Sequence, residues 1–263
     1  MKRAASAALL AALLLTAGCA PPARDAAPVA RDGAATEKLL ERLRERIEAV
    51  RSFRCEGTML LETETEKHFI HFQARYRRPD RLRVDLDVGG PLGLGSGRLT
   101  VAERGDTLEA LLPDEEFPRR GLIGDPSFAF LDETGLGFGD AAYLIAPFTG
   151  RPDLFTPHRL LASARDGRTG AERLVLQRDD GNREVLIADP AAGRLLERRV
   201  TRPGGEVLLI CFYGDEKGGG DPFPEETECR IPRKRTILRT RYGSTTLNPD
   251  LPDRIFRADH LLP

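Results

Sequence analysis

Residues 36–51, TEKLLERLRERIEAVR, place their apolar side chains along one stripe of a helix and their charged side chains on the remaining surface. The stripe consists of Leu39, Leu40, Leu43, Ile47 and Val50. This spacing predicts one amphipathic helix that packs against the rest of the protein. Thr36 is placed to cap the start of the helix, and Glu37 suits the positive end of the helix dipole.

After this helix the hydrophobic period changes to two, which is the period of a β-strand. The clearest example is 81–88, where Leu82, Val84, Leu86 and Val88 alternate with arginines and aspartates. Such alternation predicts antiparallel strands with one apolar and one charged face. The same pattern predicts further strands at 53–64, 67–77, 97–104, 106–113, 158–165, 171–178, 183–189, 194–202, 205–213 and 229–242. Pro232 either interrupts the last strand or is accommodated within it, and both alternatives stay open. The chain is expected to form about ten strands in all.

Residues 114–156 break the alternation. They are rich in proline and glycine and contain two apolar pieces, PSFAFL and GDAAYLIAPF. The second piece is predicted to form a short helix that begins at Asp140 and stops at Pro147. A long irregular segment between two series of strands is typical of a lid or a binding element.

The N-terminus, MKRAASAALLAALLLTAGC, joins a basic start to a short apolar run and ends in small residues before Cys19. This pattern predicts a secretory signal that is too short to span a bilayer permanently. Its end resembles a bacterial lipobox, although Thr16 stands where leucine is commoner. The resemblance implies cleavage before Cys19 and acylation of its thiol. By the same analogy, alanine at position 20 favours location of the lipoprotein in the outer membrane over retention in the inner membrane. An ordinary signal peptide that contains a cysteine is the alternative.

These features divide the chain into three parts. Residues 1–18 are the predicted lipoprotein signal peptide, and 19–35 hold the lipidated cysteine and a flexible tether rich in proline and alanine. Residues 36–263 are predicted to form one folded domain.

Charge and motifs exclude several classes of function. The chain has 40 basic and 41 acidic residues, and removal of Lys2 and Arg3 with the signal changes the net charge from −1 to −3. Such a chain lacks the positive footprint of a nucleic-acid-binding protein. The sequence contains no GxSxG, P-loop or HExxH motif, and His68 and His71 have an odd offset that places them on opposite strand faces. We therefore expect no catalytic site, no metal site and no cofactor.

Once Cys19 is acylated, Cys55, Cys211 and Cys229 remain. Cys211 and Cys229 fall on neighbouring predicted strands, and export permits a disulfide between them. Three buried free thiols are the alternative.

The order of elements resembles that of the periplasmic LolA/LolB lipoprotein carriers. The resemblance is carried by RRPDRLRVDLDVGGPLGLGSGRLTV (77–101), GDAAYLIAPFTG (139–150) and LNPDLPDRIF (247–256). The lipobox makes the chain most similar to the acylated LolB-like members. This resemblance implies a mainly β fold with α, in which a half-open antiparallel β-barrel, an N-terminal helix and a mid-chain helical lid enclose an apolar cavity.

The segment VGGPLGLGSG, residues 88–97, is a glycine-rich loop that carries Leu92 and Leu94. The resemblance gives Leu92 the role of an exposed tip that helps to insert lipoproteins into the membrane, and Leu94 adds a second apolar residue. A flexible apolar tip gains free energy only by entering an apolar environment. The alternative is that both leucines fold back over the edge of the sheet.

The resemblance implies a protein that binds acyl chains or lipoproteins and aids their insertion into the outer membrane. We expect it to be a monomer that faces the periplasm and exchanges cargo with a periplasmic carrier. The predicted cavity and lid residues are Leu82, Val84, Leu86, Leu99, Val101, Tyr143, Leu144 and Phe148. The alternative is a structural or interaction lipoprotein whose half-barrel is filled by its own side chains and which binds a protein partner.

Overall fold

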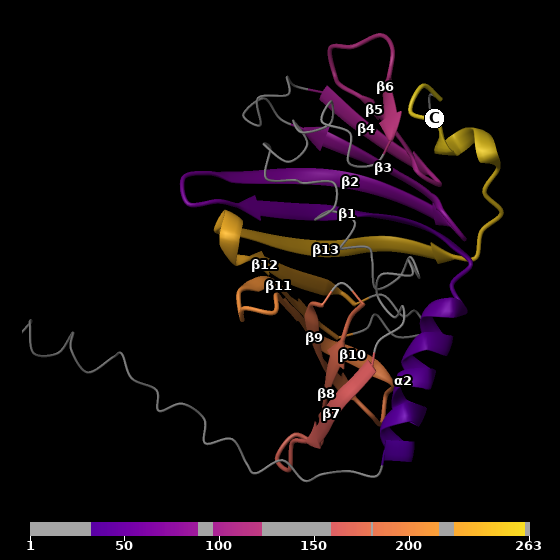
Figure 1. The fold of residues 1–263 in the computed structure, drawn as a ribbon. Coiled ribbons are helices and arrows are strands. Elements are labelled where there is room, and N and C mark those ends of the chain that lie inside the picture. Colours follow the sequence, from indigo (N-terminus) through magenta and orange to yellow (C-terminus); the bar gives the residue numbers. More distant parts are fainter. Residues whose placement is uncertain (1–32, 89–96, 123–158, 180, 216–223, 261–263) are drawn as a thin grey trace, which may run out of the picture.

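The computed structural model describes residues 33–88, 97–122, 159–179, 181–215 and 224–260 (Figure 1). The predicted lipidation site Cys19 lies outside the described residues, as does the loop with Leu92 and Leu94. The predicted mid-chain helix, with its lid residues Tyr143, Leu144 and Phe148, also lies outside them.

The predicted amphipathic helix is α2, Gly33–Glu48. It begins within the predicted tether, and its Leu39 and Leu43 are buried as the stripe requires. Thr36 does not cap the helix, because it lies three residues after the first helical residue. Instead its hydroxyl contacts Ser163 Oγ at 2.9 Å and Glu172 Oε1 at 3.3 Å, so it joins the helix to the sheet.

Thirteen strands are present in the described part of the chain, and they form one sheet. The strands are β1 (Ser52–Glu62), β2 (Lys67–Arg77), β3 (Arg81–Val88), β4 (Gly97–Arg104), β5 (Thr107–Leu111), β6 (Arg119–Leu122), β7 (Arg159–Arg165), β8 (Glu172–Gln177), β9 (Arg183–Asp189), β10 (Arg194–Thr201), β11 (Val207–Tyr213), β12 (Glu226–Ile231) and β13 (Thr236–Leu247). Every hydrogen-bonded pair is antiparallel, which confirms the strand orientation expected from the alternation.

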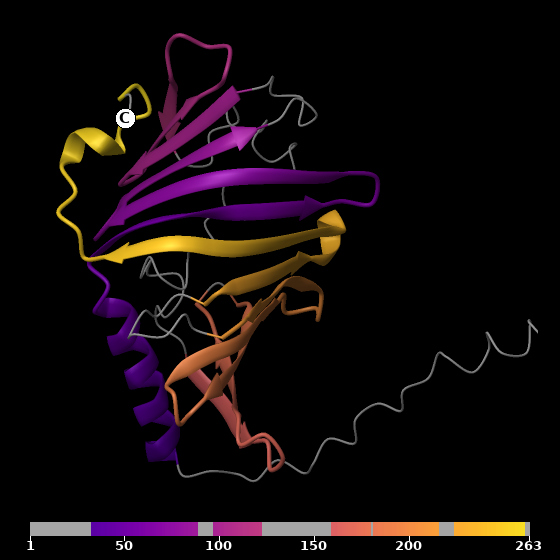
Figure 2. The ribbon, with the colours of Figure 1, turned by 180° about the vertical axis from the view of Figure 1, so that it is seen from behind.

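The sheet has the order β6-β5-β4-β3-β2-β1-β13-β12-β11-β10-β9-β8-β7 and is open, with β6 and β7 at its edges. The chain therefore forms two meanders that meet where β1 pairs with β13 (Figures 1 and 2). Helix α2 runs beside the β8–β10 end of the sheet in both views.

The prediction of about ten strands is wrong in number for two physical reasons. Strand β6 forms at the start of the irregular segment because it pairs with β5. The stretch 229–242 divides where a 3-10 turn, Pro232–Lys234, is followed by Arg235 in a left-handed conformation at φ 49°. Proline cannot donate to a strand ladder, so the interruption left open at Pro232 is present.

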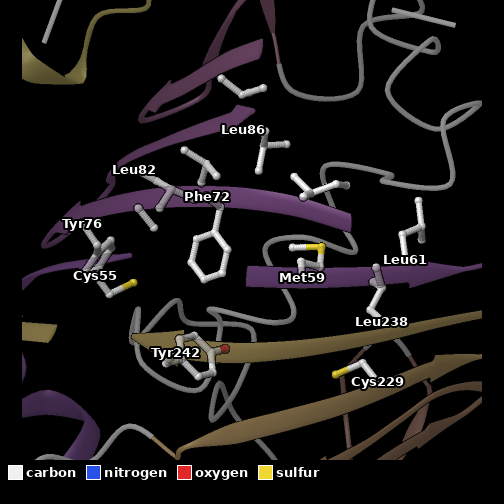
Figure 3. Packing of buried hydrophobic residues seen from close by; sticks show 14 of the residues in the cluster. Cys55, Met59, Leu61, Phe72, Tyr76, Leu82, Leu86, Cys229, Leu238 and Tyr242 are labelled. Carbon is white, nitrogen blue, oxygen red and sulfur yellow. The ribbon is translucent and has the colours of Figure 1, made fainter. Parts of the chain in front are cut away.

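One face of the sheet, here called the apolar face, carries the main hydrophobic cluster (Figure 3). It includes buried side chains from β1 to β5 and from β10 to β13. Cross-strand partners share a face, and Leu186 of β9 pairs with Arg198, which pairs with Cys211 of the cluster. The second cluster, in which Leu39 and Leu43 of α2 meet Leu174 and Leu186, therefore extends the same face, and α2 covers its β8–β9 end.

The C-terminal segment 248–260 packs on the opposite face, over β3 and β4. Its apolar residues Leu251, Ile255 and Phe256 are buried there. The Arg83 guanidinium donates hydrogen bonds to the carbonyls of Ile255, Arg257 and His260 and holds the segment in place. Among the described helices, none has the length and apolar character needed to cross a membrane.

Candidate functional site

The five residues predicted to line an apolar cavity lie together on the apolar face. Leu82, Val84 and Leu86 belong to β3, and Leu99 and Val101 belong to β4. Leu86 is paired with Leu99, and Val84 is paired with Val101. All five side chains are at most 3% exposed. The alternation in the sequence thus identified residues that share one face, and their role in holding a ligand stays a prediction.

The apolar face extends well beyond these five residues. Across the meeting point of the two meanders, Leu61 of β1 pairs with Leu238 of β13, which pairs with Cys229 of β12. Leu209 of β11 belongs to the same cluster. The sequence analysis did not assign these residues to the site, although alternation in 236–242 gave a usable signal.

The pairing of β1 with β13 contains a β-bulge near the middle of this face, and the extra residue lies in β13. The register between β1 and β13 shifts between Cys55 and Gly57. A Cβ atom at Gly57 would lie 2.4 Å from the carbonyl oxygen of Arg241 and 2.8 Å from the ring of Phe72, so only glycine fits. The Phe72 and Tyr242 rings meet edge to face in front of it, with centroids 6.1 Å apart (Figure 3). A bulge increases local twist, which helps to curl the sheet.

Three buried polar side chains form a short row across neighbouring strands of the apolar face. Tyr213 of β11 pairs with Thr227 of β12, and Thr227 pairs with Thr240 of β13. These three side chains, here called the polar row, are 8%, 2% and 2% exposed. Sequence reasoning missed them, because their alignment depends on the register of three strands, which alternation within one strand does not give.

A buried ion pair lies near the polar row. The Arg198 guanidinium of β10 donates to the Glu184 carboxylate of β9, and both side chains are at most 1% exposed. Burial raises the pKa of the Tyr213 phenol, while Arg198 lowers it and Glu184 adds to the rise. Burial likewise raises the pKa of the Tyr242 phenol. Both phenols therefore keep their protons and can donate hydrogen bonds.

The structure joins Cys211 and Cys229 by a disulfide between directly paired positions of β11 and β12. Cys55 is buried on the same face and is not part of this disulfide. The crosslink fixes two neighbouring strands of the apolar face beside the polar row.

Metal chemistry finds no support in the described ranges. Within them, no group of three or more histidine, cysteine, aspartate or glutamate side chains could hold a metal ion. His68 faces the apolar side, where its Nε2 lies 2.9 Å from Glu66 Oε2, while His71 is exposed. The two imidazoles lie on alternate faces of β2, as their odd offset predicted.

An open antiparallel sheet with an N-terminal helix over one end of its apolar face is the arrangement of the LolA-like fold. A LolA superfamily protein, NE2245 from Nitrosomonas europaea, matches with a TM-score of 0.59 and 15% identity over 86% of this chain and 98% of its own. A DUF1329 family protein from Desulfovibrio piger matches with a TM-score of 0.61 and 15% identity over 86% of this chain and 96% of its own.

A third solved structure, a domain from Vibrio parahaemolyticus named for outer membrane lipoprotein sorting, has a TM-score of 0.52 and 13% identity over 84% of this chain and 96% of its own. At these identities the likeness establishes the fold. No protein-family profile and no curated protein matches the chain in sequence. The predicted resemblance to LolA/LolB carriers is thus confirmed at the level of the LolA-like fold.

Proposed function

We propose that this protein binds acyl chains or lipoproteins on the apolar face of its open sheet. The observation that carries the proposal is the apolar face, whose main hydrophobic cluster draws on both meanders and includes all five predicted cavity residues. Each methylene of an acyl chain buried on such a face contributes about 0.8 kcal/mol, so a long chain binds without any charged contact. Two solved structures of similar fold are named for the LolA superfamily and for lipoprotein sorting, which supports this function.

The cellular setting belongs to the same proposal. The protein is anchored in the outer membrane through acylated Cys19, faces the periplasm and acts there as a LolB-like monomer. It receives cargo from a periplasmic carrier and needs no cofactor, because transfer between hosts runs down a gradient of free energy. It performs no enzymatic reaction. Tyr143, Leu144 and Phe148 contribute to a lid over the cargo.

Delivery into the membrane is assigned to the loop that carries Leu92 and Leu94. Burial of one leucine contributes roughly 1.5–3 kcal/mol, which suits a brief contact with the bilayer. Leu92→Glu should therefore slow the transfer of a fluorescent phospholipid from the full chain to liposomes by about tenfold or more, because 1.4 kcal/mol corresponds to a factor of ten. Binding of the same phospholipid should be unchanged, which a stopped-flow transfer assay beside an equilibrium titration measures.

The matched control is Leu122→Glu, which changes a leucine that is 64% exposed on the edge strand β6. This variant should transfer phospholipid at the rate of the unaltered chain. Equal transfer rates for Leu92→Glu and the unaltered chain would contradict the insertion role, and loss of binding in Leu92→Glu would mean that the loop belongs to the cavity instead.

A second candidate function is docking of a protein partner on the opposite face of the sheet. That face has a hollow of about 520 Å³ whose lining includes Leu60, Phe69 and Phe212. Phe69 is 62% exposed, which is unusual for a large apolar side chain. A partner bound there in stoichiometric amounts, together with an apolar face that takes up no lipid, would support this function in place of the first.

A further inference from the structure

The polar row stands out because it interrupts an apolar surface. Along the line of cross-strand partners, Tyr213, Thr227 and Thr240 are followed by Met59 of β1 and Ile70 of β2, which are both buried and apolar. The hydroxyls of the row therefore lie directly beside the surface that would take acyl chains. A ligand that spans this boundary has an apolar part and a polar part in contact.

Two hydroxyls of the row are buried without an internal partner. In the described part of the chain, neither the Tyr213 hydroxyl nor Thr240 Oγ1 makes a hydrogen bond. Nearly all buried polar groups in proteins are hydrogen-bonded, because an unpaired one is costly. Two such groups in one row indicate a site that is completed by a ligand.

The charge around the row indicates what kind of group the ligand presents. Arg198, the buried cation whose charge acts on the Tyr213 phenol, already donates to Glu184, and the two charges offset each other. The row itself offers hydroxyl donors, since the raised pKa of Tyr213 keeps its proton in place. Neutral donors beside a balanced ion pair suit a neutral acceptor, such as a carbonyl oxygen, better than a carboxylate or phosphate.

We propose that the polar row binds the ester carbonyls at which two acyl chains join the head of a diacyl ligand, while the chains lie on the apolar face of β1 to β5. This inference rests on the proposed function and names the polar part of the same ligand. Ester carbonyls of this kind occur in diacyl phospholipids and in the acylated N-terminal cysteine of lipoproteins, so the test must separate these two sources.

The experiment compares a diester phospholipid with its diether analogue, which has the same chains and head but no carbonyls. Native mass spectrometry of the full chain, released from detergent micelles that contain both lipids, gives their relative occupancy. One hydrogen bond is worth about 1 kcal/mol, which is about fivefold in affinity, so two hydroxyls predict a diester preference of roughly 25-fold. The double variant, Tyr213→Phe with Thr240→Val, should abolish the preference. Its affinity for the diester lipid should fall, while its affinity for the diether lipid should stay the same.

The matched control is Thr58→Val, which removes a hydroxyl from β1 on the opposite face of the sheet, where Thr58 pairs with Arg241 of β13. This variant should keep the diester preference. In the lipid-depleted chain, the Tyr213→Phe and Thr240→Val substitutions should leave the unfolding midpoint unchanged or raise it, because they remove unpaired buried hydroxyls. A lowered midpoint would mean that the hydroxyls have internal partners, and would overturn the inference.

The remaining outcomes separate the inference from the function on which it rests. If the unaltered chain binds both lipids equally, the role of the polar row is wrong and lipid binding stands. If it binds neither lipid, the same measurement with a tripalmitoyl-cysteinyl lipopeptide decides between the sources. If the unaltered chain binds the lipopeptide and the double variant binds it more weakly, the polar row is supported as a site for the esters of lipoproteins. Absence of binding to all three probes overturns both the inference and the proposed function.

Discussion

Asp85→Ala is expected to destabilise the protein by about 3–5 kcal/mol, because it leaves two buried guanidinium groups without their shared carboxylate. Asp85 accepts hydrogen bonds from Arg75 Nη1 at 2.8 Å, Arg83 Nη2 at 2.8 Å and Thr100 Oγ1 at 2.7 Å. Its side chain is 3% exposed, and those of Arg75 and Arg83 are 6% and 3% exposed. Burial already lowers the pKa of Arg75, and Asp85 opposes this. Denaturant-induced unfolding measures the loss.

The matched control is Asp87→Ala, two residues further along the same strand and on the same face. Asp87 lies 3.5 Å from Arg98, and both side chains are at least half exposed. An exposed pair of this kind contributes at most about 1 kcal/mol, so Asp87→Ala should change stability little. Losses of similar size at Asp85 and Asp87 would contradict the account of a buried charge network that ties the C-terminal segment to β3.

Leu174→Ala is expected to cost about 2–5 kcal/mol and to release helix α2 from the sheet. Leu174 of β8 is fully buried and packs in one cluster with Leu39 and Leu43 of the helix. Its removal opens a cavity at the contact that holds the helix over the β8–β9 end of the apolar face. The free energy of unfolding gives the cost, and faster proteolysis within 33–48 reports release of the helix.

Val175→Ala controls for this substitution, because Val175 follows Leu174 in β8 but points to the opposite, half-exposed face. It should cost under about 1.5 kcal/mol and leave the rate of proteolysis in the helix unchanged. If Leu174→Ala has the same free energy of unfolding and the same rate of proteolysis as Val175→Ala, then α2 is held to the sheet by other contacts, such as the one between Thr36 and Glu172.

Local periodicity predicted the elements of the fold well. The helical stripe of Leu39 and Leu43 and the alternation of 81–88 are properties of neighbouring residues, and both elements are present. The pairing of β1 with β13 joins residues about 190 positions apart, as in Phe53 with Leu247, and periodicity holds no information on it. The short strand β6 exists only because β5 is beside it, which explains why it was read as part of an irregular segment.

For the candidate site, as for the fold, the sequence predicted the features that lie within one strand and not those that depend on pairing between strands. Val84 and Val101 were assigned to one face because an alternating strand shows which residues share a side. The polar row could not be found in this way, since its residues come from three strands whose register is set by long-range packing. Only the structure shows that Tyr213, Thr227 and Thr240 are aligned across three strands. Only the structure shows that, in the described part of the chain, the hydroxyls of Tyr213 and Thr240 make no hydrogen bond.

The central claim is that the apolar face binds acyl chains. The most direct measurement is mass spectrometry of the lipids that stay bound to the full chain after purification from membranes. The account predicts about one diacyl lipid or acylated peptide per chain, in addition to the covalent acyl groups expected at Cys19. A folded chain that carries its own acyl groups and no other lipid would contradict the claim.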